Sequence, residues 1–209
     1  MKNKKNKRSN IVNSELEKQR LTAIGKHHVL SFKRIFSDEE IQQLRDLLDS
    51  EYQQAQIGQI TTGKELNSEI RRSKVRFVPE QEYKWVYDRL WSAAKELNKL
   101  YKFNLTGIKE TIQLARYDED EQGFYCWHKD TSVAWMSRKI SISVPLSSTL
   151  EFEGGDLQFM LGNGGEPMTV NQIKGHAVCF PSYEQHRVTP VTKGRRYSLV
   201  AWIGGPDWA

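Results

Sequence analysis

From about residue 110 the sequence changes to short runs rich in Ile, Val, Thr, Phe and Tyr, separated by clusters of Gly, Pro, Asn and Asp. Runs of this length and composition predict β-strands. Because no helical pattern lies between them, they argue against a parallel sheet and favour a jelly roll or barrel. The eight predicted strand segments are TIQLARY, GFYCWH, KISISVPL, GGDLQFML, MTVNQI, HAVCFP, HRVTPV and RRYSLVAWI.

Two helices are expected before these strands. In SFKRIFSDEEIQQLRDLLDSEY, Ser37 can cap a helix and Glu40 can close a capping box, ahead of one apolar stripe. A second stripe at helical spacing runs from Tyr83 to Tyr101, after Pro79. The sequence therefore predicts an α+β fold, with helical support over 27–109 and a β core over 110–209.

A chain of 209 residues with 38% hydrophobic content can bury one sizeable core, so we expect a single domain over 27–209. No apolar run approaches the roughly 18 to 20 residues that span a bilayer, so no membrane association is expected. The basic opening MKNKKNKRSN lacks the apolar segment of a secretory signal. We therefore predict a disordered tail over 1–26 and a cytoplasmic location.

The net charge of +5 would suit a nucleic-acid partner, but much of the excess lies in the tail, where a solvated arm needs none. No nucleic-acid partner is expected. Cys126 and Cys179 are too few and too far apart for a disulfide scaffold or a zinc knuckle. Both are predicted to be small buried residues, with reactive thiols as the alternative.

The stretch YCWHKDTS contains the first chemically informative pair. Side chains two apart share one face of a strand, so His128 and Asp130 would converge if the strand continues. A second strand histidine, His186, follows far downstream. Two imidazoles and one carboxylate on a β scaffold suit non-haem Fe(II), with open positions left for chemistry. Zinc usually prefers a tetrahedral set, so the pattern favours iron.

Arg196 follows ten residues after the second histidine, which leaves room for one strand, a turn through Thr192–Gly194 and an antiparallel return. Its guanidinium would then lie near the metal and suit the distal carboxylate of a dicarboxylate ligand. Ser198 and Trp202 share its parity. Ser198 is a further donor to that carboxylate, whereas Trp202 is either a wall of the pocket or an ordinary core aromatic.

Five stretches of the sequence, which contain the residues named above, resemble the Fe(II)- and 2-oxoglutarate-dependent dioxygenases, specifically the prolyl 4-hydroxylase-like branch. The resemblance covers roughly residues 110–204 in order, and IRRSKVRFV resembles the approach segment of the same branch. The matching stretches are ARYDEDEQGFYCWHKD, RKISISVPLSS, FEGGDLQF, GHAVCFPSYEQHRVTPV and GRRYSLVAWI.

The resemblance implies a double-stranded β-helix (jelly-roll) core that uses Fe(II), 2-oxoglutarate and O2. It implies that His128, Asp130 and His186 are the catalytic iron ligands and that Arg196 pairs with the C5 carboxylate of 2-oxoglutarate. Tyr117 is implied as a further contact of the cosubstrate, although the loop YDEDEQG after it is longer than is usual in the family.

Two residues are candidate substrate contacts. Tyr125 occupies a position that often lines the substrate site, but its parity places it opposite His128 unless the strand bulges. Arg187 belongs to the rim segment PSYEQHR. The implied activity is hydroxylation of a C–H bond with release of succinate and CO2, most plausibly on a peptidyl proline. A free amino acid or another small metabolite is the alternative substrate.

Two readings of other classes remain open. A non-catalytic jelly roll that binds sugar or a protein would not need His186 and Arg196 together, and a zinc or iron sensor would not need the arginine.

FEGGDLQF is interpreted as a hairpin or bulge, because no phosphate-loop pattern follows it. QAQIGQITTGK, residues 54–64, is either a flexible lid or an ordinary connection. The pattern does not indicate an oligomeric state.

Overall fold

The first helix begins where the sequence predicts it. In the computed structural model, which describes residues 29–59, 63–65, 67–160 and 165–208, α2 spans Asp38–Ser50. The Ser37 hydroxyl accepts the backbone N–H of Glu40 at 3.3 Å, and the Glu40 carboxylate accepts the backbone N–H of Ser37 at 2.8 Å. The predicted capping box is confirmed. The buried face of α2 consists of Ile41, Leu44 and Leu48.

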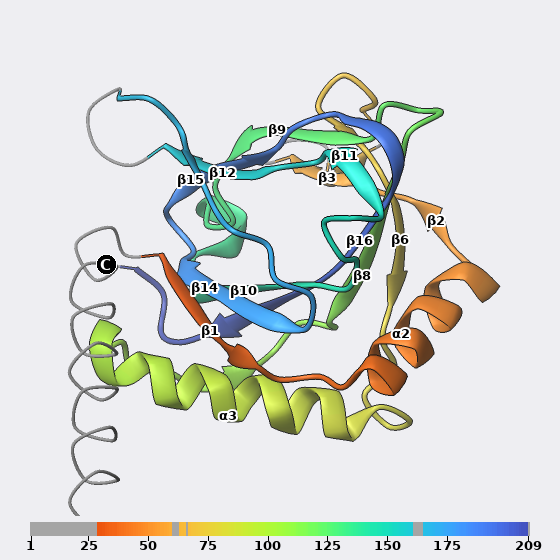
Figure 1. The fold of residues 1–209 in the computed structure, drawn as a ribbon. Coiled ribbons are helices and arrows are strands. Elements are labelled where there is room, and N and C mark those ends of the chain that lie inside the picture. The colour runs from red at the N-terminus through yellow and green to blue at the C-terminus, as the bar shows by residue number, and fades with distance from the viewer. Residues whose placement is uncertain (1–28, 60–62, 66, 161–164, 209) are drawn as a thin grey trace, which may run out of the picture.

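The second predicted helix is α3, Lys84–Tyr101. It lies along the outer side of the larger sheet (Figure 1). Lys102 ends it in the left-handed conformation, with φ of 59°. Its buried residues are Val86, Tyr87, Leu90, Ala93, Ala94 and Leu97. No helix within the described ranges is long and apolar enough to cross a membrane.

The larger sheet runs in the order β1-β14-β10-β16-β8-β6-β2, and β7 and β11 also pair with β16. Every pairing is antiparallel. Its strands are β1 (Leu30–Arg34), β2 (Gln53–Gln54), β6 (Lys74–Phe77), β7 (Gly107–Ile108), β8 (Gln113–Asp118), β10 (Arg138–Pro145), β11 (Phe152–Gly154), β14 (His176–Pro181) and β16 (Val191–Gly204).

The smaller sheet runs in the order β13-β12-β15-β9-β5. Its strands are β5 (Arg71–Arg72), β9 (Phe124–His128), β12 (Leu157–Met160), β13 (Met168–Thr169) and β15 (Gln185–Val188). A separate pair is formed by β3 (Ile57–Gln59) and β4 (Gly63–Glu65), and Val133–Trp135 form a short 3-10 helix, η1. The two facing antiparallel sheets confirm the predicted α+β jelly roll.

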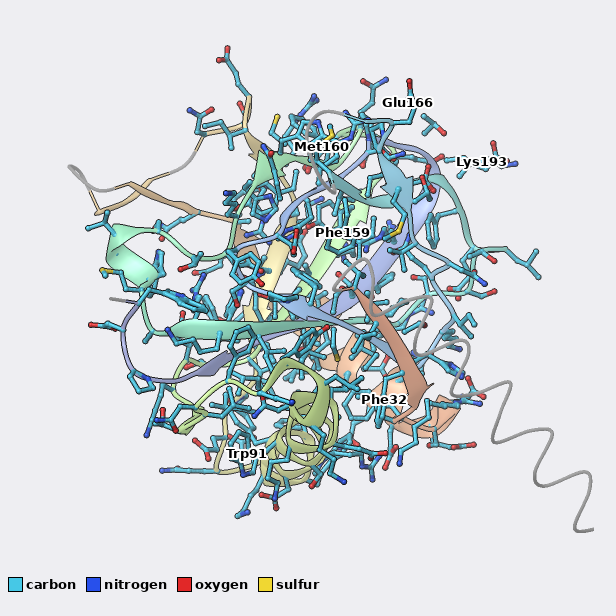
Figure 2. The ribbon with its side chains drawn as sticks, turned by 90° about the vertical axis from the view of Figure 1, so that its left-hand side faces the viewer. Phe32, Trp91, Phe159, Met160, Glu166 and Lys193 are labelled. Carbon is cyan, nitrogen blue, oxygen red and sulfur yellow. The ribbon has the colours of Figure 1, made fainter. Side chains whose placement is uncertain are left out.

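The space between the sheets is filled by apolar side chains. Phe159 of β12 is fully buried and meets Phe180 of β14 edge to face, with ring centroids 4.8 Å apart. Figure 2 shows Phe159 between the two sheets, whereas Glu166 and Lys193 lie at the outer surface. This core holds the inner faces of β9, β12 and β15 at a fixed distance from β10, β14 and β16.

Several local predictions need correction. The segment 27–109 is not only helical, because β1, β5 and β6 extend the two sheets. Strands such as Arg71–Arg72 are too short to show an alternating apolar pattern. Cys126 is exposed, whereas Cys179 is buried as predicted. The predicted tail over 1–26 and residues 60–62 of the predicted lid lie outside the described residues.

The connection from β15 to β16 also differs from the prediction. The break falls at Thr189–Pro190, and Thr192–Gly194 continue inside β16. Pro190 has no N–H to donate to a ladder, so the chain leaves the smaller sheet there and enters the larger one. Arg196 therefore reaches the core by a crossover between sheets and not by an antiparallel return within one sheet.

The segment FEGGDLQF makes a similar crossover and is not a hairpin, but the shift in register between Glu153 and Gly154 agrees with the predicted bulge. Its first part is β11, which pairs with β16, and its second part is β12, which pairs with β15. Between them Gly154 and Gly155 adopt φ of 72° and 60°, a region that favours glycine. The two glycines turn the chain from one sheet to the other.

A cluster of charges joins α2 to the larger sheet. Asp118, 4% exposed, lies 2.7 Å from Lys74 Nζ and 3.0 Å from Arg116 Nε. Arg116 also donates to the Asp49 carboxylate on α2 at 2.5 Å. Burial raises the pKa of Asp118, but the hydrogen bond from Lys74 and the charge of Arg116 outweigh it and hold that pKa below its usual value.

Replacing this carboxylate tests the cluster. We expect Asp118→Asn to destabilise the protein at pH 7 by about 3 to 5 kcal/mol, because it leaves two buried cations short of a partner. The folded pKa is lowered, so the contribution is present above the unfolded value of 3.8 and is lost as the pH falls below it. Urea unfolding at pH 7 and pH 3 measures this contribution. Between these pH values the free energy of unfolding should fall less in Asp118→Asn than in the unchanged protein.

The control is Asp88→Asn, which removes an exposed ion pair with Lys84 within α3. That change should cost less than about 1 kcal/mol. Equal acid sensitivity of Asp118→Asn and the unchanged protein would contradict the role given to Asp118.

Candidate metal centre and the cavity around it

Two histidines face each other across the smaller sheet. His128 is the last residue of β9, and the register places it directly opposite His186 of β15. Asp130 follows two residues later, and its carboxylate oxygens lie 3.8 Å from His128 Nε2 and 3.7 Å from His186 Nε2. One ligand atom from each of the three residues lies within 4.8 Å of the others. The predicted triad is therefore brought together.

Backbone carbonyls fix the orientation of both imidazoles. His128 Nδ1 lies 2.8 Å from the carbonyl oxygen of Cys126, and His186 Nδ1 lies 2.9 Å from that of Glu184. Because a carbonyl only accepts, Nδ1 carries the proton and Nε2 presents its lone pair toward Asp130. Burial, with the neighbouring His186, lowers the pKa of His128 to about 3, so this ring is neutral and able to ligate a metal.

Asp130 lies beyond the end of β9, so the strand does not continue as far as the prediction required. Instead, its backbone N–H donates to the carbonyl of Ser182 at 3.0 Å, and the Ser141 hydroxyl donates to its carboxylate at 2.6 Å. Burial raises the pKa of Asp130, but both histidines, Arg138 and the Ser141 hydrogen bond outweigh it and lower that pKa. The carboxylate is therefore held ionised.

A bulge in β9 decides where Tyr125 points. Val188 pairs with Tyr125 and His186 with His128, so two steps on β15 match three steps on β9. The extra residue returns Tyr125 to the face of His128. Their rings stack with centroids 3.5 Å apart and an interplanar angle of 17°. Burial raises the pKa of Tyr125 to about 12, so its phenol is neutral.

Arg196 on β16 is only 2% exposed, and it has neutral partners. Its Nε and Nη2 donate to the side-chain oxygen of Gln172 at 3.1 and 2.7 Å, and Nη1 donates to Ser198 at 3.2 Å. The guanidinium carbon lies 5.2 Å from the centre of the Tyr117 ring. Burial lowers the pKa of Arg196. Within the described residues no carboxylate lies within 4 Å of this guanidinium, so it favours an anionic ligand.

Gly155 and Gln172 position this arginine, and the sequence analysis identified neither in that role. A Cβ on Gly155 would lie 2.9 Å from Arg196 Cδ, so only glycine leaves room for the arginine stem. The Gln172 amide donates to the carbonyl of Gly155 at 3.1 Å, which aims its oxygen at the guanidinium. A single polar residue in the loop between β13 and β14 gives no sequence signal for such a role.

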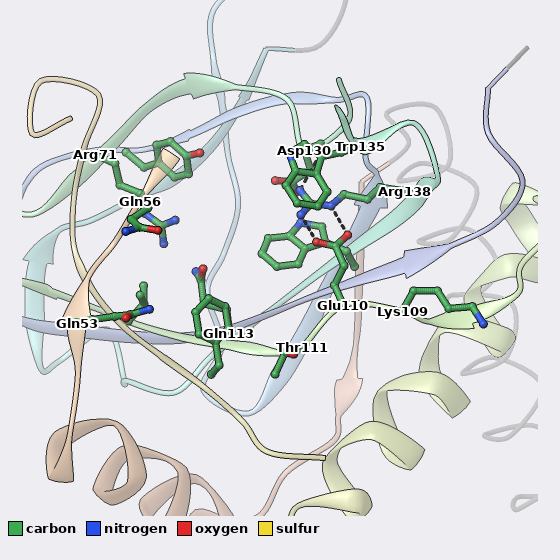
Figure 3. A pocket seen from close by; sticks show the side chains of 14 residues that line it. Gln53, Gln56, Arg71, Lys109, Glu110, Thr111, Gln113, Asp130, Trp135 and Arg138 are labelled. Carbon is green, nitrogen blue, oxygen red and sulfur yellow. Dashed lines mark hydrogen bonds and ion pairs between the residues drawn. The ribbon is translucent and has the colours of Figure 1, made fainter. Parts of the chain in front are cut away.

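The predicted residues share one cavity between the sheets. It is lined by the triad and by Tyr117, Tyr125, Arg196, Ser198 and Trp202. An outer cavity adjoins it and shares Arg71, Gln113, Tyr125, Asp130 and Trp202 with it. Figure 3 shows Gln53, Gln56 and Arg71 on one side of the outer cavity, with Glu110, Trp135 and Arg138 on the other.

Arg187 is the predicted site residue that the structure does not bring to the cavity. It follows inward-facing His186 on β15 and so points to the opposite face of the sheet. There it donates to Gln158 at 2.8 Å and lies 4.7 Å from the centre of the Trp127 ring. Arg71, which the sequence analysis did not single out, occupies the cavity wall instead.

Comparisons with known proteins show which sequences and folds the chain resembles. Residues 112–204 match the family model of the 2OG-Fe(II) oxygenase superfamily. A PKHD-type hydroxylase of Idiomarina loihiensis is 33% identical over 93 residues, 44% of this chain and 41% of that protein. A PKHD-type hydroxylase of Synechococcus is 30% identical over 149 residues, 70% of this chain and 64% of that protein. The chain thus spans about two fifths of the length of the first of these relatives.

Solved structures share the fold. A prolyl-4-hydroxylase of Pseudomonas putida matches with a TM-score of 0.67 and 18% identity, over 90% of this chain and 98% of that one. A prolyl hydroxylase of Trichoplax adhaerens, in complex with a hypoxia-inducible-factor peptide fragment, matches with a TM-score of 0.72 and 18% identity, over 94% and 92%. Residues 112–204 are therefore similar to the 2OG-Fe(II) oxygenase superfamily, and the chain shares its fold with these two prolyl hydroxylases.

Proposed function

We propose that the chain is an Fe(II)- and 2-oxoglutarate-dependent dioxygenase in which His128, Asp130 and His186 hold the metal. The donor set supports this, because two neutral imidazoles and one carboxylate are the ligands of non-haem Fe(II) oxygenases. Both imidazoles present Nε2 toward the carboxylate, so one ion could contact all three side chains. Hydrogen bonds to Cys126, Glu184 and Ser141 fix the three side chains, as is typical of metal centres.

The proposal rests above all on the buried guanidinium of Arg196. It shares the inner cavity with the triad, and its hydrogen-bond partners in the described part of the chain are all neutral. In the proposed role it binds the C5 carboxylate of 2-oxoglutarate, with Ser198 as a second donor and Tyr117 beside it. A metal sensor or a sugar-binding jelly roll gives no reason to bury a cation that has no carboxylate within 4 Å among the described residues.

Bound Fe(II) supplies the O2 activation that couples decarboxylation of 2-oxoglutarate to hydroxylation of a C–H bond. The chain supplies position and exclusion of water. Arg196 sets the depth to which the cosubstrate enters, and apolar side chains of Leu157, Phe180 and Val188 line the same cavity. Tyr125 lies against His128 and limits rotation of that ring.

The proposed substrate is a peptide or protein, with a peptidyl proline as the target residue. Support comes from the branch to which the fold belongs and from the peptide in the Trichoplax complex. The outer cavity gives an extended ligand a place to lie beside the metal centre (Figure 3). A free amino acid or another small metabolite is the alternative, since fold alone does not fix substrate.

The cofactor chemistry can be tested without a substrate. Anaerobic addition of Fe(II) and 2-oxoglutarate should give a visible metal-to-ligand charge-transfer band, and admission of O2 should give slow formation of succinate. His128→Ala should lose both, because it removes one metal ligand. Folded protein that shows neither the band nor succinate would favour the binding-module reading.

Arg196→Ala should weaken 2-oxoglutarate binding by about two to three orders of magnitude, since losing one partner of a buried ion pair costs about 3 to 5 kcal/mol. Titration of the charge-transfer band with 2-oxoglutarate measures this affinity. The matched control is Arg195→Ala, whose exposed side chain points away from the cavity. Similar affinities in the two variants would remove Arg196 from the proposed role.

Ser141→Ala should weaken metal binding by about 10- to 100-fold, because the hydroxyl orients the Asp130 carboxylate at 2.6 Å. Anaerobic calorimetry with Mn(II) in place of iron provides the measurement. Ser50→Ala, an exposed change at the end of α2, is the control. Unchanged Mn(II) affinity in Ser141→Ala would show that the carboxylate holds its orientation without this bond.

A further inference from the structure

Four arginines in the described part of the chain are buried, and they fall into two classes. Arg116 has carboxylate partners in Asp49 and Asp118, and Arg138 forms a two-pronged pair with Glu110. Arg71 and Arg196 have none within 4 Å among the described residues. Both of these line the inner cavity. Arg196 is accounted for by the cosubstrate, so Arg71 is the buried cation that still lacks an anion.

Arg71 is held at the point where the two cavities meet. It lies opposite Tyr125 in the β5–β9 ladder and is 8% exposed. Its Nε donates to Ser73 at 2.9 Å, and its guanidinium carbon lies 4.7 Å from the centre of the Tyr125 ring. Because Tyr125 in turn stacks on His128, the guanidinium is the outer layer of a stack that ends on a proposed metal ligand.

The terminal nitrogens of Arg71 remain available to a ligand. Among the described residues, neither makes a hydrogen bond, and the side chain contributes to the walls of both cavities. A fixed stem with free Nη donors suits two-pronged recognition of a carboxylate. Figure 3 shows Arg71 on the wall across the outer cavity from the Glu110–Arg138 pair.

Trp202 is a second wall residue whose polar atom lacks a partner. Trp202 Nε1 is buried with no hydrogen-bond partner among the described residues, and Trp202 lines both cavities. A buried donor without a partner is costly unless a ligand or water satisfies it. Arg138 lies 4.0 Å from the Trp202 ring, but Glu110 already neutralises its charge. The uncompensated charge at this junction therefore belongs to Arg71.

We propose that Arg71 recognises a carboxylate of the primary substrate, at a position distinct from the cosubstrate carboxylate at Arg196. The inference rests on the proposed function. Fe(II), Asp130, the 2-oxoglutarate dianion and Arg196 are together neutral, so Arg71 leaves one positive charge that a carboxylate of the substrate neutralises. The substrate class is thus a carboxylate-bearing molecule, either a peptide with an acidic side chain near the target or a free amino acid.

Matched probes test the carboxylate directly. Anaerobic calorimetry on the full chain with Fe(II) and 2-oxoglutarate compares L-proline with L-prolinamide. It also compares acetyl-Ala-Asp-Pro-Ala-amide and acetyl-Ala-Pro-Asp-Ala-amide with their Asn counterparts. At least one acidic probe should bind about 10- to 100-fold more tightly than its amide, as expected for charge-assisted hydrogen bonds. Preference for proline itself points to a free amino acid, and preference for an Asp peptide points to an acidic side chain.

Variants assign the preference to Arg71. Arg71→Gln should abolish the discrimination, whereas Arg71→Lys should keep part of it through its charge. Arg187→Gln removes an arginine on the other face of the sheet and should keep all of it. Urea unfolding checks that each variant is folded. If Arg71→Gln is not folded, the test rests on Arg71→Lys, in which the preference for the acid over the amide should be reduced.

Equal affinities for each acid and amide, no binding of any probe, or full discrimination in the folded Arg71 variants would overturn the inference. Failure of the proposed function has a different signature. In that case the charge-transfer band and the substrate-independent succinate are absent in the unchanged protein, while Arg71-dependent binding of an acidic probe persists.

Discussion

The site depends on the antiparallel pairing of β9 with β15, which sets His128 opposite His186. Side chains alternate along a strand, so a slip of one residue would turn either histidine to the outer face of the sheet. The same register places Arg187 outside and Val188 inside. The bulge adds the one deviation that the cavity needs, since it keeps Tyr125 on the inner face and stacked on His128. Pairing thus fixes both the metal ligands and the residue that lies beside them.

Asp130 lacks the support of a strand, and β10 with the segment after β14 replaces it. Ser141 holds the carboxylate, Arg138 donates to the backbone carbonyl of Asp130 at 3.0 Å, and Ser182 accepts its backbone N–H. Arg138 is itself fixed by Glu110 and lies between Trp135 and Trp202. A ligand outside the ladder is therefore as well positioned as the two histidines within it.

The sequence was sufficient for features that depend on local pattern. The Ser37–Glu40 capping box and the strand segments follow from spacing, and the triad with Arg196 follows from a motif. Prediction from the sequence failed where the chain passes from one sheet to the other. Pro190 and the Gly154–Gly155 pair mark a break in a strand, but they do not reveal with which strand the next segment pairs. Gln172 and Arg71 acquire their roles only through those crossovers and pairings. Neither residue carries a distinctive local pattern, so sequence reasoning had no means of finding them.

The distribution of buried charge separates structural sites from the proposed ligand sites. Where Arg116 and Arg138 stabilise the fold, Asp and Glu side chains of the chain itself balance them. Where Arg196 and Arg71 line the cavity, neutral groups such as Gln172 and Ser73 hold the guanidinium and leave its charge unbalanced. Burying such a charge costs stability that the fold alone does not recover. A bound anion recovers it, so both departures from the pattern of the other buried arginines are best explained by ligands.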